Sequence, residues 1–338
     1  MRVTIADIAA RAGVSKTTVS RVLNGRPDLD QGTAARVRAV IEKLDYVPSS
    51  GAVGLARGRT GVVGVLLPSV AWPWMGEVLQ GVIDTIEAAA HGVMLFTCTR
   101  GDESMRRFSS QVSARSFDAL VVIEPEGTLD YIAGLHVQGL PVVMIDDRGN
   151  HARPTSVFHS GFPSVATTNL EGAAAAARHL LERGRHHPVV LRGSMKYGCT
   201  SERLEGFAEI YAAAGLPVDP ARVVDGQFSI AGGRAAIHAL LETASSFDAV
   251  FAHNDLSAAG ALRGLRAAGL AVPRDVSVIG FDDVPLTEVT EPPLTSVHQP
   301  RREMGVAAAA MVLAHVNGSA DGGTRQVIPT SLTIREST

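Results

Sequence analysis

A capped pair of short helices near the amino end constrains this chain more than any other stretch. Residues 4–24 read T-I-A-D-I-A-A-R-A-G-V-S-K-T-T-V-S-R-V-L-N. Thr4 is a good helix N-cap, and Asp7, three residues later, completes a capping-box-like pair. Gly13 can adopt the backbone conformation that ends a helix, and Ser15 is a second N-cap. The spacing therefore predicts two helices joined by a tight turn.

The two predicted helices have one apolar face and one polar face. The apolar positions that would face inward are Ile5, Ile8, Ala9, Ala12, Val14, Val19, Val22 and Leu23. Lys16, Thr17, Ser20 and Arg21 remain on the outer side of the second helix. In a helix-turn-helix, the first turns of the second helix enter the major groove of DNA. The pattern predicts a DNA-reading surface at these side chains, and an ordinary hairpin with a solvated polar face is the alternative.

Charge is distributed unevenly along the 338 residues. Residues 1–60 carry 10 Lys and Arg against 5 Asp and Glu, a balance of +5, whereas the remainder has a balance of −8. A basic head on an acidic body suits a small nucleic-acid module joined to a part that need not touch phosphate.

Several classes of protein lack their usual sequence signals here. Cys98 and Cys199 lie far apart without metal-ligand spacing, and no nucleotide-binding or hydrolase motif occurs, so we expect no metal, no cofactor and no enzyme activity. No apolar run is long enough to span a bilayer, and the start runs directly into a capped helix without a signal peptide. We therefore expect a cytoplasmic protein that does not enter membranes.

The remaining sequence predicts a small helical headpiece, a linker and a large α/β body. A third helix over 31–44 would complete a headpiece of residues 1–47, and the Gly-rich stretch 48–60 reads as a hinge. From 61 to 338, apolar strands alternate with helices. Strands are predicted at 61–68, 92–99, 118–124, 141–146, 187–192, 248–253 and 276–281. Helices are predicted at 75–90, 103–115, 128–138, 170–184, 201–214, 231–244, 256–268 and 301–316. This alternation predicts parallel sheets covered on both faces, arranged as two doubly wound lobes, with a TIM barrel as the alternative.

With these parts in view, the chain resembles the lactose-repressor/galactose-repressor (LacI/GalR) family over essentially its whole length. The segments that carry the resemblance are the run 4–24, L-D-Y-V-P at 44–48, S-E-R-L-E-G-F at 201–207, F-D-A-V-F-A-H-N-D at 247–255, V-S-V-I-G-F-D-D at 276–283 and L-T-S-V-H-Q-P at 294–300. The resemblance implies a body like a periplasmic sugar-binding protein, with three crossovers and ligand in the cleft. Lobe 1 would be about 61–163 plus 300–327, and lobe 2 about 164–299 plus 328–338.

The resemblance also assigns roles in DNA binding. Lys16 and Thr17 would be the main major-groove readers and Arg21 a base or phosphate contact, with Ser20 beside them. Thr4, Ser15 and Asn24 complete the candidate contacts in the headpiece. Leu55 matches a hinge leucine that wedges into the minor groove when a hinge helix forms. Gly51 and Gly54 depart from that pattern, and each costs a helix about 1 kcal/mol relative to Ala. We therefore expect a hinge that orders only on DNA, with a plain tether as the alternative.

Candidate ligand-binding residues lie where open α/β lobes bind their ligands, at the carboxyl ends of strands. Asp146, Asn254 and Asp282 occupy such positions. The resemblance adds Arg203, Gln299 and Phe228. Trp74 would inherit a ligand-facing aromatic role, and Trp72 and Arg100 are further candidates. Asp255 and Asp283 read instead as turn or helix-cap residues.

These observations favour a ligand-responsive transcriptional repressor. Carboxylate, amide and guanidinium groups beside aromatic platforms suit sugar hydroxyls better than a purine. We expect a homodimer on a near-palindromic double-stranded operator that controls genes of carbohydrate uptake or catabolism, with a saccharide as effector. The alternative is a sugar- or nucleobase-binding sensor that acts without operator binding.

Overall fold

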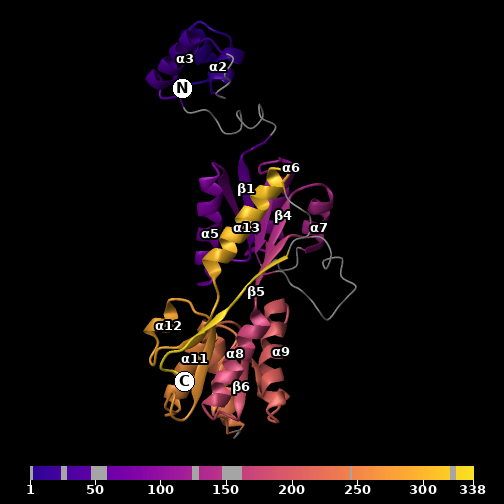
Figure 1. Cartoon of the computed structure of the whole chain (residues 1–338), viewed down its shortest axis with the longest axis vertical. Helices are drawn as coiled ribbons and strands as arrows, with labels where there is room; N and C mark the ends of the chain where they lie inside the picture. Colours follow the sequence, from indigo (N-terminus) through magenta and orange to yellow (C-terminus); the bar gives the residue numbers. More distant parts are fainter. Residues whose placement is uncertain are drawn as a thin grey trace. The chain divides into compact units, whose positions relative to one another are not determined.

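The computed structural model describes residues 3–23, 29–46, 59–123, 129–146, 162–243, 246–319 and 325–338. The chain divides into two compact units, Met1–Gly61 and Val62–Thr338, which we call the headpiece and the body (Figure 1). The candidate DNA contacts Asn24 and Leu55, and most of the predicted hinge, lie outside the described residues.

The described residues of the headpiece form three helices, α1 (Ile5–Ala12), α2 (Lys16–Leu23) and α3 (Gln31–Lys43). The predicted capping box is present, because the Thr4 backbone N–H donates to Asp7 Oδ2 at 2.8 Å while Thr4 Oγ1 accepts from the Asp7 N–H. Gly13 ends α1 in the left-handed conformation, with φ of 66°. The Ser15 hydroxyl accepts from the Thr18 N–H at 3.1 Å at the start of α2. The small core shared by the three helices consists of Ile8, Ala9, Ala12, Val19, Val22, Ala34 and Val37.

The body is built on two six-stranded sheets. The first sheet runs in the order β11 (Arg325–Ile328), β5 (Ser164–Thr167), β4 (Val142–Ile145), β3 (Ala119–Ile123), β1 (Val62–Leu67) and β2 (Gly92–Thr97). The second runs β12 (Ser331–Thr333), β10 (Thr295–His298), β9 (Ser277–Asp282), β8 (Ala249–Ala252), β6 (Pro188–Arg192) and β7 (Val223–Asp225). All pairings are parallel except that between β10 and β12.

Helices cover both faces of each sheet, as buried parallel strands require. On the first sheet, α5 (Met75–Ala88) and α13 (Arg301–Val316) lie side by side on one face, and α6 (Asp102–Ser113) and α7 (Leu129–Val137) cover the other (Figure 1). On the second, α8 (Asn169–Glu182) and α9 (Gly198–Ala213) cover one face and α10 (Ile230–Glu242) and α11 (Asp255–Ala267) the other. Short α12 (Leu286–Val289) and the 3-10 helix η2 (Pro220–Arg222) complete the described helices. The two doubly wound lobes confirm the predicted fold, and the alternative prediction of a TIM barrel is wrong.

The predicted boundary between the lobes needs a small correction. We placed residue 164 onward in lobe 2, but β5 pairs with β4 and β11 in the first sheet, so the chain leaves lobe 1 only after Thr167. Ile328, which we placed in lobe 2, pairs with Thr167 in that same sheet. Five strands, β5, β7, β10, β11 and β12, were absent from the prediction because they are short and carry polar residues.

Three chain crossovers connect the lobes, and hydrogen bonds join them to one another. The Thr167 hydroxyl donates to Gln299 Oε1 at 2.8 Å, which connects the first crossover to the second. The hydroxyls of Thr168 and Thr330 lie 2.9 Å apart and connect the first to the third. Any change in the angle between the lobes must therefore bend the chain within this small polar region, which lies beside the pocket described next.

Candidate functional site: a helix-turn-helix surface and an interlobe pocket

The predicted DNA-reading face of α2 is open to solvent. Lys16, Thr17 and Arg21 are exposed and Ser20 is half-buried. Val19, on the opposite side of the helix, is fully buried. Ser15 is exposed too, but its hydroxyl caps α2. The headpiece thus presents the Lys16 ammonium, two hydroxyls and the Arg21 guanidinium on the side of α2 that a DNA groove would meet.

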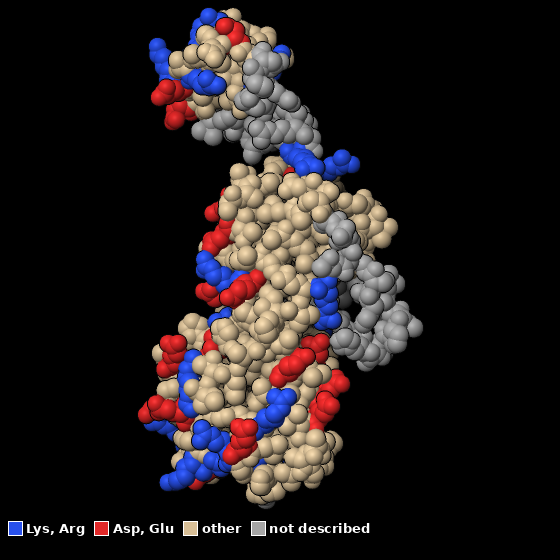
Figure 2. All heavy atoms as spheres, in the orientation of Figure 1, with Lys and Arg blue, Asp and Glu red and all other residues tan. Residues whose placement is uncertain are grey.

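On the body, the face seen in Figure 2 shows no comparable single-sign patch. Lys and Arg are interspersed with Asp and Glu on the visible side of the second lobe, so neither sign dominates it. A phosphate-binding surface needs clustered cations. Among the described residues, the face of α2 is the stronger candidate for contact with DNA.

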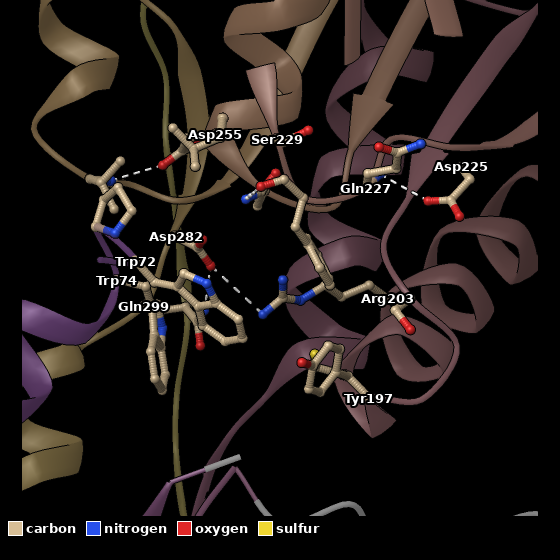
Figure 3. Close-up of a pocket in the computed structure, with 17 residues that line it drawn as sticks. Trp72, Trp74, Tyr197, Arg203, Asp225, Gln227, Ser229, Asp255, Asp282 and Gln299 are labelled. Atoms are coloured by element: carbon tan, nitrogen blue, oxygen red, sulfur yellow. Dashed lines mark hydrogen bonds and ion pairs between the residues drawn. The ribbon is translucent and has the colours of Figure 1, made fainter. Parts of the chain in front are cut away.

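A cavity of about 570 Å³ lies between the lobes. This volume falls within the range of roughly 300–1,000 Å³ usual for small-molecule sites. Trp72 and Trp74 enter it from the loop after β1 in the first lobe, and Gln299 enters from a crossover. Most of the other lining residues come from the carboxyl ends of second-lobe strands (Figure 3). The cavity therefore lies where open α/β sheets bind their ligands.

Seven of the nine predicted ligand-binding residues line this cavity: Trp72, Trp74, Arg203, Phe228, Asn254, Asp282 and Gln299. Arg100 and Asp146, both among the described residues, do not. Arg100 instead lies on the surface just before α6 and pairs with Glu103, in the first turn of that helix, at 3.5 Å. Asp146 is buried at the end of β4, and its charge acts on Asp282.

The structure adds lining residues that sequence reasoning missed: Pro73, Ser194, Tyr197, Cys199, Asp225, Gln227, Ser229, Asp255, Leu256 and Val284. Most of the polar ones lie in two connections, between β6 and α9 and between β7 and α10. The first connection follows a strand that was predicted, so the rule about strand ends would have found Ser194 and Tyr197. The second follows β7, which was not predicted.

Arg203 is held at the floor of the cavity by four contacts. Its Nε donates to Asn169 Oδ1 at 2.9 Å, and an Nη donates to the backbone carbonyl of His253. A second Nη lies 3.8 Å from Asp282 Oδ1. The plane of the guanidinium stacks on the Phe281 ring, with 3.7 Å between its central carbon and the ring centroid. Arg203 therefore acts mainly as a fixed positive charge that positions the Asp282 carboxylate.

The pKa of Asp282 is set by burial and by the charged groups around it. Burial is the largest influence and raises its pKa to about 6. Arg203, a 2.6 Å hydrogen bond donated by Gln299 Nε2, and the charge of Arg301 all favour the ionised form and oppose this rise. The Asp146 carboxylate raises the pKa further by repulsion. A buried carboxylate of this kind gains from ligand donors that replace the water it has lost.

Two neighbouring residues already have internal partners. Asn254 Oδ1 accepts from the Ser257 N–H at 2.9 Å, which caps α11, and its Nδ2 donates to the Phe228 carbonyl at 3.2 Å. Asp255 is fully buried and accepts from the Ser296 hydroxyl, and burial raises its pKa well above the usual value. These bonds give Asp255 a structural role, as the sequence indicates. A ligand would have to share Asn254 with the protein.

Aromatic rings line the cavity from both lobes. The rings of Trp72, from the first lobe, and Tyr197, from the second, meet nearly at right angles with 6.2 Å between centroids. The rings of Tyr197 and Phe228 also lie side by side, with 6.0 Å between their centroids. The Phe228 ring occupies the space above Gly193, where any Cβ would overlap it. Gly193 is therefore the residue that allows this aromatic surface to form.

Replacing Gly193 with Ala tests this arrangement. The added methyl must displace Phe228 from the cavity wall, so affinity for a cavity ligand is expected to fall roughly tenfold, the loss of about 1.4 kcal/mol of contact. Isothermal titration of the variant against the wild type would measure it. Gly134→Ala, in α7 of the first lobe where nothing lies within 4 Å of a new Cβ, is the control and should bind normally. Equal affinity in G193A would show that Phe228 does not contact the ligand.

Comparison with known proteins supports this geometry. Residues 4–49 match the family described as bacterial regulatory proteins, lacI family, and residues 177–338 match a periplasmic binding protein-like domain. The regulator CelR of Thermobifida fusca is 33% identical over 99% of this chain and 98% of its own length. The solved structure of a CelR–cellobiose complex covers 100% of both chains with 32% identity and a TM-score of 0.76. The lac repressor dimer bound to operator and the anti-inducer ONPF is 25% identical, with a TM-score of 0.88 over 100% of this chain and 99% of that one.

A helix-turn-helix headpiece on a two-lobed body with a ligand-sized cavity defines a DNA-binding transcriptional regulator that responds to a ligand. The chain belongs to the lacI family of bacterial regulatory proteins. The family is described as one of regulatory proteins, and CelR is named as a transcriptional regulator. Within the part of the chain that the structure describes, no helix is long and apolar enough to cross a membrane.

Proposed function

We propose that this protein is a dimeric repressor of genes for carbohydrate uptake or catabolism, and that a saccharide binds in the interlobe cavity and alters its affinity for a near-palindromic operator. The observation that carries the proposal is the composition of the cavity, in which aromatic rings lie beside carboxylate and amide groups. Rings offer apolar faces to a pyranose, and carboxylates and amides accept from or donate to its hydroxyls. A related regulator, CelR, has been solved with cellobiose bound.

The alternative is a sensor that acts without binding an operator. The exposed polar face of α2 disfavours this alternative, because Lys16, Thr17 and Arg21 lie on the outer side of a well-capped helix. Two-fold symmetric headpieces would place two such helices on half-sites about one helical turn, or a multiple of it, apart.

A ligand screen on the full-length protein tests the proposal. Thermal unfolding is measured with a panel of mono- and disaccharides, cellobiose included, and with a second panel of nucleobases and nucleosides. A ligand at about 100 times its Kd stabilises the folded state by roughly 2.7 kcal/mol, which raises the unfolding midpoint measurably. We expect a hit in the saccharide panel. Hits confined to the nucleobase panel would contradict the proposal.

The raised pKa of Asp282 predicts how affinity depends on pH. Sugar hydroxyls donate to the ionised carboxylate, so affinity should fall several-fold as the pH drops through about 6. The stability of the ligand-free protein should change in the opposite direction. The stabilising contribution of Asp282 is complete below its ordinary pKa of 3.8 and is lost as the pH rises through about 6. Titration at several pH values would measure the first effect. Asp282→Asn should make the ligand affinity nearly independent of pH. If the affinity of D282N depends on pH as strongly as that of the wild type, the dependence belongs to another group.

A further inference from the structure

Acidic side chains outnumber basic ones among the described residues that line the cavity. Among the described residues that line it, three are acidic, Asp225, Asp255 and Asp282, and one is basic, Arg203. Burial raises the pKa values of Asp255 and Asp282, but Arg203 and Gln299 favour the ionised form of Asp282, and Asp225 is at the more open end with about half of its side chain exposed. An anionic ligand would bring its charge toward these carboxylates.

Arg203, the one cation among the described lining residues, already has buried partners. Arg203 donates to Asn169 and to the His253 carbonyl, faces Asp282, and stacks on Phe281. A phosphate could recruit this guanidinium only by displacing a buried partner, and leaving a buried charge without its partner is strongly unfavourable. Arg203 is therefore a poor anchor for a phosphoryl group.

A second cation near the cavity is neutralised by the acid beside it. Arg192, at the end of β6, is half-buried, and its Nη1 donates to the Gly193 carbonyl at 2.9 Å. The same Nη1 lies 4.0 Å from Asp225 Oδ2. The other Asp225 oxygen accepts from the Gln227 N–H at 2.8 Å, which fixes the carboxylate at the cavity edge. Asp225 thus opposes the positive charge of Arg192 at this edge of the cavity.

We propose that this cavity selects an uncharged saccharide and rejects its phosphorylated form, with Asp225 as a specificity-determining residue. The inference rests on the proposed function and narrows its ligand class. In physical terms, a phosphate dianion a few ångströms from a carboxylate at a partly buried site meets repulsion large enough to outweigh the hydrogen bonds it could form. Neutral hydroxyls, in contrast, are attracted as donors by the same carboxylates.

The test compares matched pairs of ligands on the full-length protein by isothermal titration. The probes are glucose, trehalose and cellobiose, each beside its 6-phosphate, together with any further neutral hit from the screen and its 6-phosphate. The neutral member of the binding pair should bind at least about tenfold more tightly than the phosphorylated one. Asp225→Asn keeps the acceptor for Gln227 but removes the charge, so the discrimination should shrink several-fold. Asp219→Asn, an exposed second-lobe acid that is not among the cavity-lining residues, is the control and should leave it unchanged.

The possible outcomes separate the two proposals. A phosphorylated sugar that binds as tightly as its neutral partner, or more tightly, would overturn the charge selection while leaving a saccharide effector in place. Discrimination that is the same in D225N as in the wild type would overturn the role of Asp225. If no saccharide of either kind binds, the proposed function is wrong and the inference falls with it.

Discussion

Arg203→Met is expected to lower the free energy of unfolding by about 3–5 kcal/mol and to abolish binding in the cavity, because it removes the partner of a buried carboxylate. Asp282 would keep only Gln299 and the more distant charge of Arg301, with Asp255 also buried close by. Methionine at position 203 retains much of the contact with Phe281. The measured loss of stability therefore reflects the missing charge more than lost packing. Urea unfolding and isothermal titration would measure the two effects.

A second substitution separates charge from packing. Adding Asp282→Asn to R203M removes the unpaired charge, so most of the stability should return while ligand binding stays absent. Arg263→Met, on an exposed position of α11, is the matched control and should unfold like the wild type. An R203M midpoint equal to that of R263M would show that the Arg203–Asp282 pair contributes little to the fold.

The second large effect is expected in the headpiece. Substituting Lys16 and Arg21 together with Ala should weaken operator binding by at least about a hundredfold, because each base or phosphate contact of a recognition helix contributes roughly 1–3 kcal/mol. Both residues are exposed, so the headpiece core of Ile8, Val19 and Val37 should remain intact. Fluorescence anisotropy with a labelled DNA fragment from upstream of the protein's own gene would measure the affinity.

A charge-matched control distinguishes specific contact from general attraction. Arg38 and Lys43 are exposed on α3, and replacing both with Ala removes the same two charges. That variant should lose only a small part of the affinity, mostly at low salt. Equal losses in the two double variants would mean that α2 does not read the DNA.

Much of the fold could be predicted from sequence because its strongest signals are local. The Thr4–Asp7 capping box and Gly13 fixed the ends of α1, and the structure has them in the expected conformations. Strands such as β1 and β3 are continuous apolar runs, which is typical of parallel strands buried on both faces. Their side chains alternate between the two cores of the first lobe.

The strands that escaped prediction lack such a signal. β5 is S-V-A-T and β10 is T-S-V-H, short and mostly buried segments although two of the four residues of β5 and three of the four of β10 are polar. Their hydroxyls are satisfied by long-range partners, such as Gln299 for Thr167 and Asp255 for Ser296. Only the folded structure brings those partners together, so periodicity alone cannot identify these strands. The misplaced boundary between the lobes follows from the same cause.

The candidate site was predictable to the extent that it follows strand ends. Asp282 and Asn254 directly follow strong apolar strands, and both line the cavity. Arg100 also follows a strand, but β2 is the edge strand of the first sheet, and Arg100 is not among the residues that line the cavity. Strand position predicts which residues could line a site, whereas the order of strands in the sheet decides which of them do.

The geometry also indicates how the two sites could communicate. Asp282, Gln299 and Thr167 form a continuous set of hydrogen bonds from the cavity floor to the crossovers between the lobes. A ligand that engages Asp282 therefore acts directly on the crossovers that connect the lobes. Because binding free energies are linked, an effector that changes operator affinity by some factor must have its own affinity changed by the same factor.

Measuring that reciprocity tests the central claim most directly. Operator affinity would be determined with and without saturating saccharide, and saccharide affinity with and without saturating operator, on the same full-length protein. We predict that both affinities change by the same factor, of roughly 5- to 150-fold, as is usual for coupled sites. An operator affinity that stays constant at every saccharide concentration, with the cavity shown to be occupied, would contradict the account.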